Sequence, residues 1–153
     1  MKKLICIFIA ISAFVAARAV TFEELRLIGK EGKAVALPKG TELIGISISD
    51  YRSENLELNP NLKWDKIDIG ENYRTAYVES EDGKFGFRLK FDGIYDCRMQ
   101  IGQKVRLDLS GCILEKQIDP ERYTIRGLGK NNVSVIEEGV AIPRKVRSSS
   151  ELR

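Results

Sequence analysis

The chain has 153 residues, of which 43% are hydrophobic, and it carries 25 basic and 22 acidic side chains. A chain of this length and apolar content suits one globular domain and excludes a disordered or fibrous protein. It contains no histidine, which excludes Ser-His-Asp and Cys-His catalysis, histidine-ligated metal sites and histidine-based pH switches.

The first 19 residues predict a signal peptide. A cationic start at residues 1–3 precedes an apolar stretch over residues 4–17. As a helix this stretch would span about 21 Å, less than the roughly 30 Å of a membrane's hydrocarbon core. Ala17, Arg18 and Ala19 form the small-x-small pattern that signal peptidases recognise, so we expect cleavage after Ala19. A membrane anchor or a buried helix is the alternative for this segment.

Cleavage would make the chain electrically neutral. It would remove Lys2, Lys3 and Arg18 and leave 22 basic and 22 acidic side chains, with no transmembrane segment in the mature chain. We therefore expect an exported protein of the periplasm, the cell surface or the extracellular medium. A neutral domain has no strong field to attract polyanions, which argues against nucleic acid as a partner.

A short helix is predicted to open the mature domain. Thr21 and Glu24 have the spacing of a capping box, in which each side chain binds the other residue's backbone N–H group. Phe22, Leu25 and Ile28 then form an apolar stripe at helical spacing.

The apolar period becomes two over residues 42–50, which predicts a half-buried strand. The face expected to point into the core comprises Ile44, Ile46 and Ile48. The opposite face comprises Gly45, Ser47 and Ser49. A polar stretch over residues 52–72 follows and predicts a long loop, in which Trp64 is either an anchor against the domain or a contact for a partner.

The clearest signal is a β-hairpin. Residues 74–80 and 85–91 alternate on either side of Asp82-Gly83, a pair typical of tight hairpin turns. The side chains expected to point inward are Ala76, Val78, Phe85, Phe87, Leu89 and Phe91. Those expected to point outward are Thr75, Tyr77, Glu79, Gly86, Arg88 and Lys90.

Three more strands are predicted after a short connection over residues 92–101. The first covers residues 104–111, places Val105, Leu107 and Leu109 toward the core, and continues over residues 112–114 beyond a bend at a glycine. The other two are residues 123–126 and 133–136.

This order of elements matches the OB-fold, a five-stranded and partly open Greek-key barrel. We expect residues 20–142 to form a mainly β, OB-fold-like barrel of five to six strands with a short N-terminal helix. A two-sheet sandwich is the alternative. Residues 143–153 are expected to form a polar tail, and a second capping-box pattern ending at Glu151 indicates that a further module could begin there.

Four segments have a distinctive joint order: TFEELR, IGISISD, AYVESEDG and IGQKVRLDLSG. They occupy residues 21–26, 44–50, 76–83 and 101–111. Together they resemble a family of exported domains of unknown function that is common in gut Bacteroidota. The resemblance implies an OB-like fold, export, and a binding or scaffolding role. It implies no established activity, so it assigns no catalytic residue.

The outward face of the hairpin is the candidate ligand-binding surface. Thr75, Tyr77, Arg88 and Lys90 share this face, and Trp64 of the preceding loop is the fifth candidate. A strand that binds single-stranded nucleic acid needs several aromatic platforms in a positive groove, and this face offers one. A glycan could stack on the Tyr77 ring, and a protein could bind the loop or add a strand to an open edge. A solvated strand face without a ligand is the alternative.

Cys97 and Cys112 are the two cysteines of the mature chain. Export permits a disulfide between them, which would stabilise the fold by roughly 3 kcal/mol; two separately buried thiols are the alternative. Their spacing does not suit a zinc site.

The sequence therefore predicts an exported, non-enzymatic binding or structural module of the cell envelope, with a protein or a cell-envelope glycan as partner. It marks no catalytic residue, no metal site and no cofactor. A nucleic-acid-binding OB domain and a glycan hydrolase that uses paired carboxylates are the alternative functions.

Overall fold

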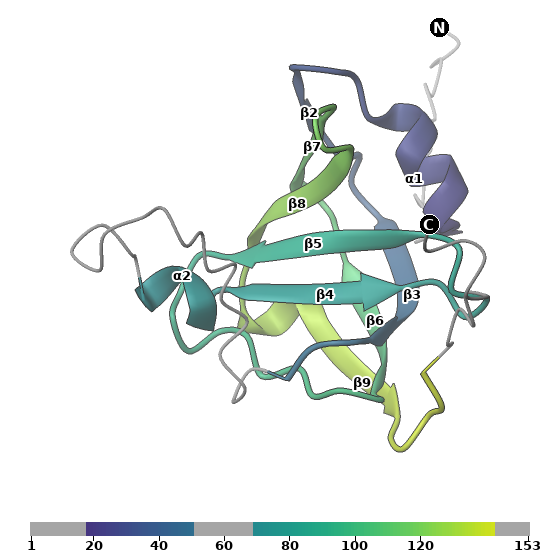
Figure 1. The fold of residues 1–153 in the computed structure, drawn as a ribbon, viewed down its shortest axis with the longest axis vertical. Coiled ribbons are helices and arrows are strands. Elements are labelled where there is room, and N and C mark those ends of the chain that lie inside the picture. The colour runs from purple at the N-terminus through teal and green to yellow at the C-terminus, as the bar shows by residue number, and fades with distance from the viewer. Residues whose placement is uncertain (1–17, 51–68, 143–153) are drawn as a thin grey trace, which may run out of the picture.

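The computed structural model describes residues 18–50 and 69–142, and these form a mainly β structure (Figure 1). Its strands are β1 Arg18–Val20, β2 Ala34–Ala36, β3 Thr41–Ser47, β4 Thr75–Glu79, β5 Gly86–Phe91, β6 Lys104–Asp108, β7 Ile113–Gln117, β8 Arg122–Leu128 and β9 Val133–Glu137. Its helices are α1 Phe22–Ile28, α2 Ile69–Tyr73 and the short 3-10 turn Lys130–Asn132. None of the helices in the described ranges is long and apolar enough to cross a membrane.

All nine strands belong to one mixed sheet in the order β2-β7-β8-β5-β4-β3-β6-β9, with β1 added to β3. The predicted mainly β class is confirmed. The predicted number of five to six strands is too low, and the sheet is open, because β2 and β9 at its two ends do not pair with each other among the described strands. Two of the additional strands, β1 and β2, were not predicted because they have three residues each, too few to produce a periodic pattern in the sequence.

The predicted strand 104–114 is two strands separated by a bend. β6 pairs with β3, whereas β7 pairs with β8, so this one segment contacts two distant parts of the sheet. The bend is held by the chain before β3: the Leu37 N–H group donates to the Cys112 carbonyl at 2.8 Å, and the Gly111 N–H group donates to the Leu37 carbonyl at 3.2 Å. Gly111 has a φ of 74°, a conformation that favours glycine.

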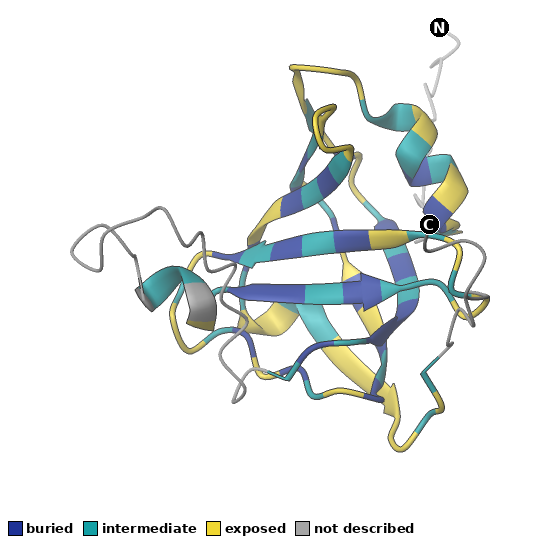
Figure 2. Cartoon of the chain, viewed as in Figure 1, coloured by how far each residue is buried: buried dark blue, intermediate teal, exposed yellow. Residues whose placement is uncertain are grey.

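The inward face of the hairpin is confirmed. Figure 2 shows buried and half-buried residues alternating along β4 and β5. The hairpin residues in the buried core are Ala76, Val78, Phe87, Leu89 and Phe91. Phe85, at the start of the predicted row, is half-buried and packs against this core. The predicted core positions Val105, Leu107 and Leu109 on the following strand segment are fully buried.

The predicted inward face of β3 is wrong for Ile44 and Ile48. Leu43, Gly45 and Ser47 are buried, and Leu43 belongs to the core cluster, whereas Ile44 and Ile48 are half-buried. Ile46, the third isoleucine of the predicted face, is 2% exposed but does not belong to the core cluster. The reason is steric: a Cβ atom on Gly45 would lie 2.7 Å from the ring of Phe22, so the ring occupies the space that a side chain would fill. A pattern of alternating isoleucines identifies a strand but not which of its faces a neighbouring helix will cover.

Helix α1 begins at the predicted capping box. The Glu24 N–H group donates to Thr21 Oγ1 at 3.1 Å, and the Thr21 N–H group donates to Glu24 Oε2 at 2.8 Å. Phe22 and Leu25 of the predicted stripe are buried, and the Phe22 ring lies 5.5 Å from the ring of Phe87. The helix therefore covers the inner face of the sheet where β3 carries no side chain at Gly45.

Three predicted features lie outside the described residues. They are the signal peptide up to residue 17, the part of the long loop over residues 51–68 that contains Trp64, and the polar tail over residues 143–153. The end of the predicted loop is described, and there the chain forms α2.

Replacing Gly45 by alanine should destabilise the fold by about 1–3 kcal/mol, because the new Cβ would lie 2.6 Å from Val78 Cγ2 and 2.7 Å from Phe22 Cζ in a closely packed core. Gly86→Ala is the matched control, since its Cβ would meet nothing closer than a carbonyl oxygen at 3.4 Å. Urea unfolding measures both. Equal stabilities of the two variants would contradict the packing described for Phe22.

Candidate functional site

The structure brings four of the five predicted ligand-binding residues together. Thr75 pairs with Lys90 and Tyr77 with Arg88 across the antiparallel β4–β5 ladder. Trp64 lies outside the described residues. Thr75 was expected to face outward, but it is 3% exposed, and its hydroxyl donates to the Glu71 carbonyl at 2.8 Å. Thr75 is buried because α2 ends one residue before β4 begins, and a carbonyl of this helix accepts the hydrogen bond from the Thr75 hydroxyl.

Glu71 of α2 lies at the centre of the charges on this face. No sequence pattern predicted its role, because residues 70–72 have the composition of a loop. Its carboxylate forms ion pairs with Lys90, with Arg88 at 3.3 Å and with Arg74 at 3.5 Å. The Nε atom of Arg88 is buried and has no hydrogen-bond partner within the described parts of the chain. We call Glu71, Arg74, Arg88 and Lys90 the basic cluster. Its three cations surround one carboxylate, and this surplus of positive charge suits an anionic group of a ligand.

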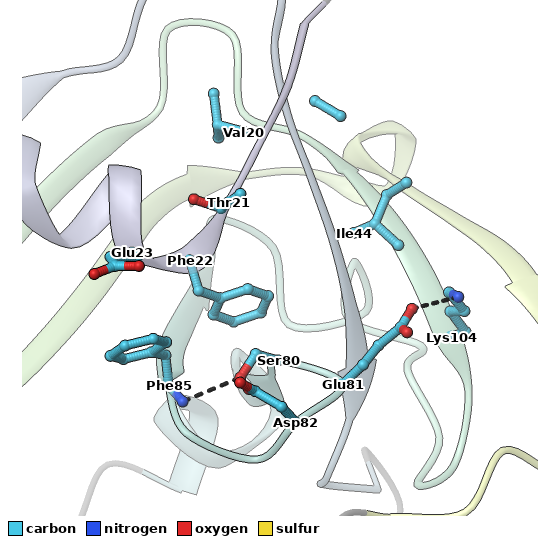
Figure 3. A pocket seen from close by; sticks show the side chains of 11 residues that line it. Val20, Thr21, Phe22, Glu23, Ile44, Ser80, Glu81, Asp82, Phe85 and Lys104 are labelled. Carbon is cyan, nitrogen blue, oxygen red and sulfur yellow. Dashed lines mark hydrogen bonds and ion pairs between the residues drawn. The ribbon is translucent and has the colours of Figure 1, made fainter.

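A second candidate site is a cavity of about 530 Å³ beside the start of α1 (Figure 3). We call it the α1 pocket. It lies between β1, α1, β3 and the β4–β5 turn, and Figure 3 shows Phe22 and Phe85 on one side of it and Ile44 and Lys104 on the other. The residues that line it are Ala19, Val20, Thr21, Phe22, Glu23, Ile44, Ser80, Glu81, Asp82, Phe85 and Lys104. Its lining is apolar at the base and charged at the rim, which is typical of binding sites.

The charged rim of the α1 pocket is held by local interactions. Lys104 of β6 forms an ion pair with Glu81, whose carboxylate raises the pKa of the lysine. Asp82 accepts hydrogen bonds from the Ser80 hydroxyl at 2.6 Å and from the Lys84 N–H group at 3.1 Å. These bonds, the Ser80 bond foremost, lower the pKa of Asp82 from 3.8 to about 2. Asp82 is therefore ionised at neutral pH.

Sequence reasoning missed the α1 pocket because its residues come from five separate elements: β1, α1, β3, the β4–β5 turn and β6. The capping box located the start of α1, and the Asp82-Gly83 pair located the hairpin turn, but neither pattern indicates that these two ends meet. The one sequence signal for the pocket was Phe85, an apolar residue directly after the polar hairpin turn.

Cys97 and Cys112 are both free and buried, so the structure contains two separate thiols and no disulfide between them. Burial raises the pKa of each thiol. The Cys112 thiol donates to the Gly127 carbonyl at 3.6 Å. Both belong to the core cluster, where the neutral thiol packs as a small apolar group.

No protein-family model matches the chain, and no curated protein or solved structure is significantly similar to it. The resemblance to a family of exported domains therefore stays a prediction.

Ser80→Ala should raise the pKa of Asp82 toward 3.8, because it removes the shortest hydrogen bond to that carboxylate. In the native chain the folded-state pKa lies below the unfolded value. The stabilisation that it provides is therefore complete above about pH 4 and is lost as the pH falls through about 2. NMR titration of the carboxyl groups measures this. The matched control is Ser110→Ala, which should raise the pKa of Asp108 and leave Asp82 unchanged.

Glu71→Gln should lower the free energy of unfolding by about 1 kcal/mol at low salt, because Arg74, Arg88 and Lys90 would lose their shared counter-charge. Added salt should restore part of the loss by screening the repulsion among the cations. Glu115→Gln removes only an exposed pair with Arg126 and serves as control. A salt-independent loss in Glu71→Gln would contradict the electrostatic account of the basic cluster.

Proposed function

We propose that this chain is an exported, non-enzymatic binding module of the cell envelope whose ligand is a segment of a protein. The α1 pocket carries the proposal. It is a concave site whose apolar base comes from Phe22, Phe85 and Ile44 and whose rim carries charges of both signs. Such a base fits an apolar side chain of a peptide, and such a rim fits its backbone and polar neighbours.

Export is supported by the N-terminal sequence, with its cationic start, apolar stretch and small-x-small pattern. Cleavage after Ala19 would leave every residue of the buried core in the mature chain, since the first of them is Phe22. We place the mature chain in the periplasm, at the cell surface or in the medium.

An OB-like barrel is the fold that we propose for this module. The path β3-β4-β5-β8-β7 is followed by the bend that joins β7 to β6, and β6 returns to β3. This order and the parallel pairing of β5 with β8 support a Greek-key barrel in which the 104–117 segment is one bent strand. On this proposal β1, β2 and β9 are additions to the barrel.

The charge state of the α1 pocket supports binding over hydrolysis. A general acid needs a carboxyl group whose pKa is raised, whereas the pKa of Asp82 is lowered to about 2. Glu81, the other rim carboxylate on this turn, is paired with Lys104.

A glycan is the second candidate ligand, and the basic cluster favours it. Tyr77 and Arg88 are cross-strand neighbours, and Arg88 Nε is a buried donor without a partner among the described residues. A sugar ring could stack on the tyrosine while an acidic substituent, such as a uronic acid carboxylate, accepts from the arginine.

The export proposal is tested by expressing the full chain in a bacterium that secretes proteins, separating the cell fractions and sequencing the N-terminus. We expect the exported form to begin at Val20. Ala19→Leu should block processing, because signal peptidases need a small residue there, and Leu27→Ala, on the exposed side of α1, should not. Retention of the wild-type chain in the cytoplasm would overturn the proposal.

The two ligand classes are separated by two variants. Mature chain is presented to a glycan array and to envelope proteins, and retention is compared for wild type, Ile44→Lys in the α1 pocket and Arg88→Gln in the basic cluster. Loss of protein retention in Ile44→Lys alone supports the proposed function, whereas glycan retention lost in Arg88→Gln alone supports the second candidate. Turnover of any glycan would contradict a non-enzymatic role.

A further inference from the structure

We propose that the edge of β3 covered by β1 becomes, after signal-peptide cleavage, a groove that binds an extended peptide of a partner protein. The inference rests on the proposed export. In the structure Arg18, Ala19 and Val20 run parallel to β3 and pair with Thr41, Glu42 and Leu43. Two of these three pairs belong to residues that cleavage after Ala19 would remove.

The groove has a defined length along β3. β1 covers the strand up to Leu43, and on the same edge β4 begins to pair at Ile46. The opposite edge of β3 pairs with β6 from Glu42 to Ile46. Loss of β1 would therefore expose a short stretch of edge between the end of β4 and the start of β3, while the rest of the strand stays paired.

The groove opens directly into the α1 pocket. Ala19 and Val20 line that pocket together with Ile44 of β3. A peptide that replaces β1 would thus gain two kinds of contact: backbone hydrogen bonds along β3 and an apolar contact with the pocket. This combination is the recognition mode known as β-strand addition.

The walls of the groove do not depend on β1. Helix α1 is anchored by the Phe22 ring against Phe87 at 5.5 Å, by the fully buried Leu25, and by the Arg26 guanidinium, which lies 4.3 Å from the centre of the Tyr123 ring. These contacts hold α1 beside the sheet after residues 18 and 19 are removed, so the groove remains formed.

The strand that now fills the groove indicates which peptide fits. Ala19 is exposed and small, and Val20 is half-buried and packs against the core cluster. Val20 stays in the mature chain, so the partner peptide should carry a small residue in the place of Ala19. Glu23, Glu81 and Asp82 on the rim disfavour acidic residues in it.

A second copy of this chain is a poorer occupant. Two identical β3 edges related by a two-fold axis would have to pair antiparallel, whereas β1 lies parallel to β3. The exposed stretch is also short, because β4 begins to pair with β3 at Ile46, so it admits a single peptide more readily than the edge of another sheet.

The test uses the mature chain, residues 20–153, and a fluorescent peptide of residues 14–19, which contains the two β1 residues that cleavage removes. We expect saturable binding in an anisotropy titration and slower amide exchange at residues 41–44. The uncleaved chain, whose groove holds its own β1, should bind the peptide at least about tenfold more weakly. A peptide with proline in place of Arg18 and Ala19 should not bind, because proline cannot donate to a strand.

Two protein variants make the test specific. Ile44→Lys places a charge in the groove and should weaken binding by about tenfold or more. Ile136→Lys on β9, a half-exposed isoleucine two strands away from β3, is the matched control and should bind as wild type does. Unfolding curves establish that both variants are folded.

The outcomes separate this inference from the proposed function. If the exported chain begins at Val20 and its folded form does not bind the peptide, the groove inference is overturned and the export proposal stands. Concentration-dependent dimerisation that protects residues 41–44 without peptide would also overturn it, because a second copy would fill the groove. If the chain is not exported, the proposed function fails, and the groove inference fails with it.

Discussion

The structure depends on one close approach, between the Phe22 ring of α1 and the backbone of β3 at Gly45. A Cβ atom at position 45 would lie within 2.7 Å of both the Phe22 ring and Val78, so a residue with a side chain would push the helix away from the sheet. With glycine there, the ring reaches Phe87 and the helix closes one side of the core. The position of α1 then determines where its first residues lie, and these residues form one wall of the α1 pocket.

The charges of this nearly neutral domain are separated into local groups. On the outer face of β4 and β5, Glu71 holds three cations together, and one guanidinium nitrogen remains buried without a partner among the described residues. At the other end of the hairpin, the turn supplies Glu81 and Asp82 to the pocket rim. The two sites therefore differ in the sign of their surplus charge, which is why a peptide without acidic residues suits one of them and an acidic glycan suits the other.

Several elements could be predicted because their signals are local. The capping box at Thr21 and the Asp82-Gly83 turn depend on residues within three or four positions of each other, and both form as expected. The alternating row from Phe85 to Phe91 was also assigned to the correct side, because an aromatic row cannot remain in water on a small domain. The sequence left open whether Cys97 and Cys112 form a disulfide or two separately buried thiols, since spacing carries no information on whether two thiols approach each other, and the structure has the separate thiols.

The sequence by itself determined the β class, the hairpin and the segments that form the core. Only the tertiary structure decided that Leu43 and Gly45, and not Ile44, face the core. The alternating sequence pattern fits either orientation of β3, and helix α1 settles it because the Phe22 ring fills the space above Gly45. It also decided that Glu71 meets Arg88 and Lys90, which are 17 and 19 positions away along the chain. The three-residue strand β1 left no pattern of its own, since it is held by backbone hydrogen bonds to β3, and these bonds are nearly independent of side-chain identity.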